Sequence, residues 1–506
     1  MNKSHTTLSR ALTGTSILFE KRSTLIVSII SVLFFVSRLL ILQNHQATWA
    51  DESHFLLAAE DILNGGVGVS FFHGELYQCI IAAFSLFIGF SFFTGKLTST
   101  IVATLLIPLF YMFNKQLFGR KWGVVAAFLL SLNPGVFWLS YMVLTEGLFT
   151  LVVLLVFVII NRTENSKVLW GFAGFFMGLV YLTRYVGALL ILCFLIFIFL
   201  KIGNLRHEKG LLIAILMIFI VLLPDFYIKT VLFGNPFHQG YTQYYVRPTE
   251  FHLAITFREL AGGITASLKV LVLLVTSIGV LFSISYIILK KDHKKNREFF
   301  IFLLLWICIH FTLHALYTGV SLHSRIRYIF PITPFLISFS IGFLKSSYEN
   351  MNKLFSKKDV AHNSFTVFAL LFIIIFSSAS SFGTFSLIGG NQISEGGARA
   401  YKDACLWINE NSNEDAIVAA PIQGSTRFHS KRTVVVLPLK EQEQTNLLQF
   451  FDENSVNYFI IDTRYGQKSP LYRKFLYQTE VPNNFHLVFE KAEDTIGYVV
   501  VVYKIC

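Results

Sequence analysis

Residues 23–42, STLIVSIISVLFFVSRLLIL, decide the fold class, because an almost entirely apolar run of this length can cross a bilayer as one helix. Similar runs recur along the chain. Hydrophobic residues make up 54% of the 506 and charged residues only 14%, which is typical of polytopic helical membrane proteins. No small-residue cleavage site follows the run, so we expect a retained span and not a removed signal peptide.

Charge in the connecting loops predicts the topology. Residues 290–297 carry five basic residues against one acid, which places this loop in the cytoplasm by the positive-inside rule. The other basic loops and the N-terminus fall on the same side only if the apolar stretch 76–93 does not cross. We therefore predict a juxtamembrane or re-entrant helix there and an extracytoplasmic C-terminus. The eleven predicted crossings are 23–43, 97–114, 122–140, 143–161, 168–183, 185–201, 210–228, 265–289, 298–318, 326–345 and 363–387.

Much of the net charge of +12 sits in these short loops, where the positive-inside rule accounts for it, so the charge does not indicate a nucleic-acid partner. The five cysteines form no CxxC motif and no disulfide framework. The predicted organisation is a cytoplasmic N-terminus (1–22), a transmembrane domain (23–387) with a first extracytoplasmic loop (44–96), and a C-terminal domain (388–506).

The C-terminal segment changes to an α/β pattern. Helices are predicted at Ala400–Asn411 and Glu441–Glu453. Strands are predicted at Ala416–Ala420, Thr433–Leu437, Tyr458–Asp462, His486–Phe489 and Tyr498–Tyr503. Alternating strands and helices predict a small extracytoplasmic α/β domain, with either an acceptor-binding or capping role or a purely structural one.

Two adjacent carboxylates, Asp51 and Glu52, follow the first crossing and lie at the predicted membrane–water boundary. One hypothesis makes Asp51 a general base and leaves Glu52 to orient it or to hold a donor. The alternative is that the pair caps a helix running to Leu63 and ended by Gly65–Gly66, because acids favour helix N-termini. That helix has the pattern of an interfacial helix, with its other polar residues (His54, Glu60 and Asp61) expected to be solvated.

Other ionisable residues sit at the ends of apolar runs on the same predicted face. Glu146 is a candidate catalytic acid, with a structural hydrogen bond as the alternative. Arg184, Arg325 and Arg327 can offer guanidinium groups to phosphate oxygens, with Tyr328 beside them; snorkelling to lipid headgroups is the alternative for each arginine.

Three histidines complete the candidates. His310 and His314 are spaced i,i+4 on one helix, and His323 follows in the next loop. The spacing is compatible with a metal site, but no paired Cys or HExxH pattern accompanies it. We therefore expect interhelical hydrogen bonds and no metal ligation.

Taken together, these motifs resemble the GT-C superfamily of membrane glycosyltransferases, in particular the protein O-mannosyltransferases and bacterial aminoarabinose transferases. The resemblance rests on the order of Trp49-Ala-Asp51-Glu52, Gly65-Gly66, Asn133-Pro134, Thr145-Glu146, Gly178-Leu-Val-Tyr-Leu-Thr-Arg184, Phe233-Gly-Asn-Pro236 and Arg327-Tyr-Ile-Phe-Pro331. It implies that Asp51 and Glu52 take part in catalysis, that Glu146 lines the same cavity, and that Arg184 is the basic residue of the Leu-Thr-Lys/Arg segment.

Two departures limit what the resemblance implies. Phe55 stands where many relatives have Tyr, which removes a hydroxyl contact. Glu75-Leu76-Tyr77 stands where the aminoarabinose branch has Glu-Lys-Pro, so the lysine that would bind donor phosphate is missing. The donor of that branch is therefore not carried over, and the role of Glu75 stays open.

The working hypothesis is an inverting glycosyltransferase in the cell membrane that uses a polyprenyl- or dolichyl-phosphate sugar. Its acceptor is a protein, lipid or glycan hydroxyl, and its active site faces outward. The resemblance implies no obligatory metal or other cofactor, while a divalent cation at Asp51–Glu52 stays open. The rival hypothesis is a transporter or flippase, although the sequence shows no internal repeat. A third is a noncatalytic relative, although the acid pair is intact.

Overall fold

The computed structural model describes twelve stretches of the chain, which fall into two compact units. The described residues are 22–42, 50–68, 74–163, 166–201, 208–237, 257–289, 297–316, 322–354, 399–438, 444–467, 469–493 and 497–506. The helical unit takes the described residues within Met1–Leu40, Ser70–Tyr77 and Leu97–Phe385. The sheet unit takes those within Ile41–Val69, Gln78–Lys96 and Ser386–Cys506.

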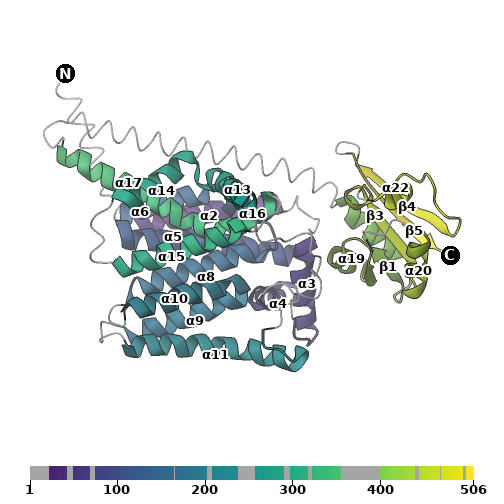
Figure 1. Cartoon of the computed structure of the whole chain (residues 1–506), viewed down its shortest axis with the longest axis horizontal. Helices are drawn as coiled ribbons and strands as arrows, with labels where there is room; N and C mark the ends of the chain where they lie inside the picture. Colours follow the sequence, from purple (N-terminus) through teal and green to yellow (C-terminus); the bar gives the residue numbers. More distant parts are fainter. Residues whose placement is uncertain are drawn as a thin grey trace, which may run out of the picture. The chain divides into compact units, whose positions relative to one another are not determined.

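The helical unit is a bundle in which α8, α9, α10 and α11 lie side by side (Figure 1). Its elements are α2 (Ser23–Leu42), α5 (Phe92–Phe118), α6 (Arg120–Ser131), α7 (Pro134–Leu139), α8 (Thr145–Ile160), α9 (Lys167–Thr183), η2 (Tyr185–Gly187), α10 (Ala188–Lys201), α11 (Glu208–Phe233), α13 (Phe257–Val275), α14 (Ser277–Leu289), α15 (Arg297–Leu316), α16 (Leu322–Ile329), η5 (Phe330–Ile332) and α17 (Thr333–Leu354).

Among the described residues, five helices are long and apolar enough to cross a membrane, or six if the bent pair α13–α14 forms one span. Four shorter apolar helices accompany them. The predicted count of eleven crossings stays a prediction, and the predicted crossing 363–387 lies outside the described residues. Helix α4 (Leu76–Ile88) would be about 20 Å long, short of a hydrocarbon core of roughly 30 Å. This length is consistent with the prediction that the segment does not cross.

Two predicted spans are wrong as single helices. Residues 122–140 divide into α6 and α7, because Pro134 keeps Asn133 extended (φ −70°, ψ 128°) and the Asn133 side chain caps α7 by accepting from Gly135 N. Residues 265–289 divide into α13 and α14, which bend by 102° around Thr276 at φ 66°. Asn133 Nδ2 also donates to the carbonyl of Leu274 at 2.6 Å. This hydrogen bond joins the break before α7 to the bend between α13 and α14.

Helices α13 and α15 approach so closely that Gly263 has no room for a side chain. A Cβ there would overlap the carbonyl oxygen of Ala315, whereas a Cβ on the neighbouring Gly262 would meet nothing within 4 Å. We expect Gly263→Ala to lower the free energy of unfolding by about 1–3 kcal/mol, because the helices must move apart. Gly262→Ala is the matched control and should leave stability unchanged or slightly raised. Unfolding in bicelles measures both, and equal stability of the two variants would contradict the close crossing.

The sheet unit contains one five-stranded sheet with strand order β2-β1-β3-β5-β4. Strand β1 pairs in parallel with β2 and β3, and β5 pairs antiparallel with both β3 and β4. Its elements are α3 (Ala50–Leu63), α4, a helix at 399–411, β1 (Ile417–Ala420), α19 (Gln423–Ser430), β2 (Thr433–Val436), α20 (Gln444–Glu453), β3 (Tyr458–Asp462), α21 (Thr463–Gly466), α22 (Pro470–Leu476), β4 (Phe485–Glu493) and β5 (Tyr498–Ile505). The predicted small C-terminal α/β fold is confirmed.

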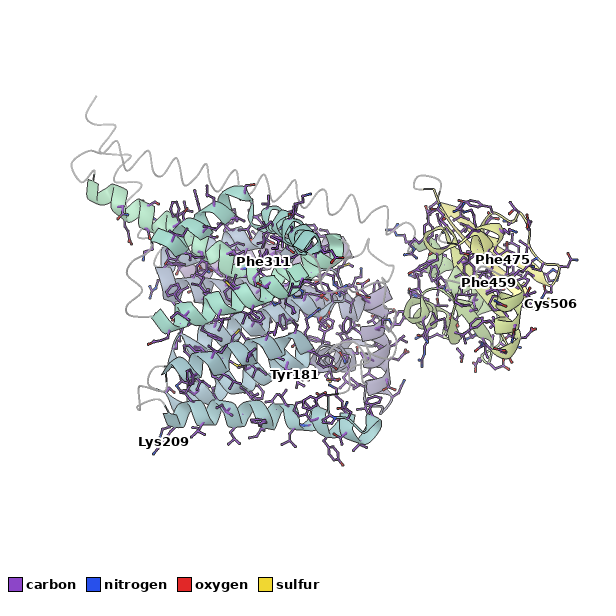
Figure 2. The ribbon with its side chains drawn as sticks, in the orientation of Figure 1. Tyr181, Lys209, Phe311, Phe459, Phe475 and Cys506 are labelled. Carbon is purple, nitrogen blue, oxygen red and sulfur yellow. The ribbon has the colours of Figure 1, made fainter. Side chains whose placement is uncertain are left out.

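Both faces of the sheet are buried. Successive residues of a strand point to opposite faces, so neighbouring residues belong to different cores. Ile460 and Val502 belong to the core on one face, and Phe459 and Tyr503 to the core on the other. Figure 2 labels Phe459 and Phe475 within the second core, where their rings meet edge to face at 5.1 Å. Each face of the sheet therefore has its own hydrophobic core, which helices cover.

Helix α3 is more enclosed than the sequence pattern suggests. Glu52, Ser53, Phe55, Leu56 and Ala59 are all fully buried. His54 is half-buried, so the prediction that it is solvated is wrong, while Asp61 is exposed as predicted. The enclosing residues come from segments far along the chain, which sequence periodicity does not reveal.

Candidate active site

A buried ion cluster lies inside the helical unit, with Glu146 at its centre. Arg184 Nη1 and Arg327 Nε both donate to Glu146 Oε1, at 2.6 Å and 2.7 Å. Arg184 Nη1 also donates to Thr145 Oγ1 at 3.0 Å. Glu146 is 1% exposed, so these are charge-assisted hydrogen bonds in a largely dry setting. Two guanidinium groups on one carboxylate leave a net positive charge.

Each member of this cluster sits at a helix end whose dipole favours its charge. Glu146 is in the first turn of α8, at the positive end. Arg184 caps the C-terminus of α9 with extended backbone (φ −153°), and Arg327 is in the last turn of α16, both at negative ends. The breaks in the apolar runs are therefore what bring these three side chains together.

Tyr328 and two histidines line one side of the cluster. The Arg184 guanidinium carbon is 5.6 Å from the centre of the Tyr328 ring, and His314 stacks on that ring at 5.1 Å. His310 Nε2 lies 2.7 Å from the carbonyl of Tyr328. This contact between α15 and α16 confirms the predicted interhelical hydrogen bond. His323 is in α16, and its side chain lies outside the described residues.

Arg325 binds a different set of groups from the other two predicted arginines. It is buried, and its Nη1 lies within 3.4 Å of the carbonyls of Gly263 and His314 and of Ser267 Oγ. These contacts join α13, α15 and α16 at their crossing. The structure thus groups Arg184, Arg327 and Tyr328 with Glu146, and gives Arg325 contacts that stabilise the fold.

A second ion cluster involves Glu75, whose role the sequence left open. Lys229 Nζ is 2.7 Å from Asp225 and 3.6 Å from Glu75 Oε1, and the Tyr185 hydroxyl donates to the same Glu75 oxygen at 3.4 Å. Burial, and then the hydrogen bond with Asp225, raise the pKa of Glu75 to about 8. Since Tyr185 directly follows Arg184, the two clusters meet at the break between α9 and α10.

Sequence reasoning missed Asp225 and Lys229. The signal was available, because two ionisable residues four apart in an otherwise apolar helix are functional candidates by default. No lysine follows Glu75 in the sequence. In the structure, Lys229 of α11 takes a comparable place beside Glu75.

The acid pair belongs to the sheet unit. Asp51 and Glu52 occupy the first turn of α3, where Glu52 is fully buried and Asp51 is half-buried. Burial is also the main cause of the lowered pKa of the neighbouring His54, which Asp51 partly opposes. This position is compatible both with helix capping and with chemistry, so the catalytic roles of the pair stay predictions. Among the residues that the structure describes, no three His, Cys, Asp or Glu side chains are grouped to hold a metal ion.

Comparisons with known proteins were made by sequence and by fold. The profile of the dolichyl-phosphate-mannose-protein mannosyltransferase family matches residues 73–228, less than half of the chain. A search of curated proteins found no significant match. The chain is similar to ArnT from Cupriavidus metallidurans, solved bound to undecaprenyl phosphate, with 13% identity and a TM-score of 0.61 over 95% of this chain and 97% of that one.

A second likeness is to the Archaeoglobus fulgidus oligosaccharyltransferase tethered to an acceptor peptide. Identity is 14% and the TM-score is 0.62, over 90% of this chain and 72% of that one. The same enzyme in complex with zinc and sulfate gives a TM-score of 0.63 at 14% identity, over 93% of this chain and 72% of that one. At these identities the structural matches establish the fold.

Together these findings define the class: a membrane protein with transmembrane helices and the GT-C glycosyltransferase fold. Within it, residues 73–228 carry the pattern of the dolichyl-phosphate-mannose-protein mannosyltransferase family. The resemblance expected from the sequence is thereby confirmed.

Proposed function

We propose that this protein is an inverting glycosyltransferase that moves a sugar from a polyprenyl- or dolichyl-phosphate donor to an acceptor hydroxyl at the extracytoplasmic face of the cell membrane. The observation that carries the proposal is the convergence of Arg184 and Arg327 on the single buried carboxylate of Glu146. The net positive charge suits a phosphate, and guanidinium forks match its oxygens. The undecaprenyl phosphate bound by the structurally similar ArnT supports the same class of donor.

In the proposed reaction, Asp51 takes the proton of the acceptor hydroxyl, and Glu52 orients it. The acceptor oxygen forms a bond to the anomeric carbon while the bond from that carbon to the phosphate oxygen breaks. The electron pair leaves with the lipid phosphate, whose charge Arg184, Arg327 and Tyr328 stabilise. One displacement inverts the anomeric configuration. Because phosphate is a good leaving group, the step needs one base and no separate acid.

Glu146 has two tasks in this scheme. It neutralises one of the two arginines before the donor arrives, and it holds both guanidinium groups in a fixed orientation. No metal is assigned to the step, and a divalent cation at Asp51–Glu52 stays an alternative to a proton-accepting role for Asp51. The acceptor class (protein, lipid or glycan) is left open by the residues of the site. The peptide acceptor of the structurally similar oligosaccharyltransferase favours testing peptides first.

A transporter or flippase is the competing function. Ionisable clusters inside a helical bundle are also found in transport pathways. The enclosed acid-pair helix and the C-terminal sheet favour the transferase, because a carrier needs neither.

The test is sugar release from donor by purified protein in lipid. We expect Asp51→Asn to lower turnover by about 10²–10⁴-fold, the range for loss of a general base. Asp61→Asn is the matched control: Asp61 lies on the same helix, is exposed, and its side chain accepts from the Gly68 amide at 2.8 Å. Asp61→Asn should keep full turnover. Equal turnover in both variants would remove Asp51 from the mechanism.

A further inference from the structure

The C-terminal part of the chain packs directly on the helix that carries the acid pair. Within the sheet unit, α19 lies against α3. Gly424 is at one end of this contact, where a Cβ would lie 2.5 Å from Ser53 Oγ and 3.1 Å from the nearest ring carbon of His54. At the other end, Lys431 Nζ donates to Glu60 Oε1 at 2.8 Å. The contact therefore joins segments more than 360 residues apart in sequence.

The spacing of these anchors shows how the two helices are aligned. Ser53 and Glu60 are seven residues apart, as are Gly424 and Lys431, and seven residues make two turns that return to the same helix face. The helices therefore run in the same direction over two turns. A side chain at position 424 would force Ser53 Oγ to move at the end of the contact next to the acid pair.

The remaining contacts fasten α19 on both sides. The Phe428 ring meets Phe90 edge to face at 6.3 Å, and Lys431 Nζ lies 5.0 Å from the centre of the Phe428 ring. On the sheet side, the hydroxyls of Thr426 and Tyr401 are 2.8 Å apart. Tyr401 is fully buried in the core of the C-terminal sheet. The helix is thus held by the sheet core behind it.

We propose that Gly424 and Lys431 are positioning residues: α19 fixes α3, and hence Asp51 and Glu52. At about 100° per residue, Ser53 and Glu60 lie about 200° and 180° around α3 from Asp51. The two anchors thus share one side of α3, and the contact sets the axial position and rotation of the helix. The expected effect on catalysis rests on the proposed function. The expected effect on the position of α3 does not. It also gives the C-terminal domain a task other than binding the acceptor.

The test combines hydrogen–deuterium exchange in α3 with donor kinetics, using the full-length protein in lipid. Gly424→Val inserts a side chain where Ser53 already lies, so the amides of α3 should exchange at least about tenfold faster, which corresponds to a weakening of about 1.4 kcal/mol. Arg427→Val is the matched control, because Arg427 is the exposed residue of the same helix. It should leave exchange in α3 unchanged. Exchange in β3 and β5 reports whether the sheet itself remains folded.

A charge exchange provides the rescue. Lys431→Glu opposes Glu60 and should speed exchange in α3 by a few-fold, since a half-exposed ion pair contributes little to stability. Adding Glu60→Lys restores the pair with the charges swapped and should return exchange to the wild-type rate.

Kinetics then separates positioning from general destabilisation. We expect Gly424→Val to lower kcat and shift the acidic limb of the kcat–pH profile, with the KM for donor unchanged. Unchanged exchange in α3 of Gly424→Val, with β3 and β5 still protected, would overturn the proposal. If the wild type turned over no donor, the proposed function would fail, while faster exchange in the variant would still support the positioning of α3.

Discussion

Glu146→Gln is expected to abolish most donor turnover, with a loss on the order of 10²-fold or more. The amide removes the negative charge of Glu146, which both Arg184 and Arg327 contact, so these two like charges lose their shared carboxylate in a buried cluster. Groups that stabilise developing charge contribute about 10²–10³-fold when correctly oriented, and this orientation depends on Glu146. The free energy of unfolding should fall as well, by about 3–5 kcal/mol, because an unbalanced buried charge is left behind.

Two further variants distinguish loss of chemistry from loss of fold. Glu349→Gln removes the acid of an exposed i,i+4 pair with Lys345 and should change neither turnover nor stability measurably. The double variant Glu146→Gln, Arg184→Gln restores the charge balance and should recover part of the stability but none of the turnover. Turnover that recovered with stability would show that Glu146 acts only through the fold.

Lys229→Met is expected to lower the free energy of unfolding by about 3–5 kcal/mol at neutral pH. Lys229 is 2% exposed and lies between Asp225 and Glu75, so its removal leaves two carboxyls without their cation. The pKa of Glu75, which burial already raises, would rise further without the lysine, so the folded variant would bind this proton more tightly than the unfolded chain. Stability contributed by a raised carboxyl pKa is present at low pH and is lost as the pH rises. The deficit of the variant should therefore be smaller at pH 5 than at pH 8.

The matched control is Lys209→Met, at the other end of the same helix. Lys209 is exposed, and Figure 2 labels it at the end of α11, away from Tyr181. Unfolding of both variants in bicelles across this pH range provides the comparison. A deficit in Lys229→Met that is independent of pH would contradict the raised pKa of Glu75 in this cluster.

The hydrophobic pattern of the sequence predicted the bounds of several helices and strands, because these bounds depend on neighbouring residues. Strand β3 has the predicted bounds, Tyr458–Asp462, and α9 differs from the predicted 168–183 by one residue. The apolar run breaks at Arg184 as expected, because a charged residue cannot continue a lipid-facing stretch without a partner. These features depend on periodicity and on individual residues, both of which are visible in the sequence.

The parts that escaped prediction depend on distant partners. The bend at Thr276 and the break at Asn133 are joined by a hydrogen bond across 141 positions, which apolar runs alone do not indicate. Asp225 and Lys229 were read as part of a span and its outer loop, because their significance comes from Glu75 on another segment. Glu146, Arg184 and Arg327 were each predicted as candidates, but only the three-dimensional structure shows that they share one oxygen and that Arg325 has other contacts.

The most direct measurement of the central claim is product formation by the purified wild-type protein in lipid, supplied with a panel of polyprenyl-phosphate sugars and nucleotide sugars. The proposed function predicts release of polyprenyl phosphate from at least one lipid-linked sugar, with inverted anomeric configuration in the product by NMR. It also predicts no turnover of any nucleotide sugar. Turnover of a nucleotide sugar, or movement of intact lipid-linked sugar between leaflets without release, would contradict it.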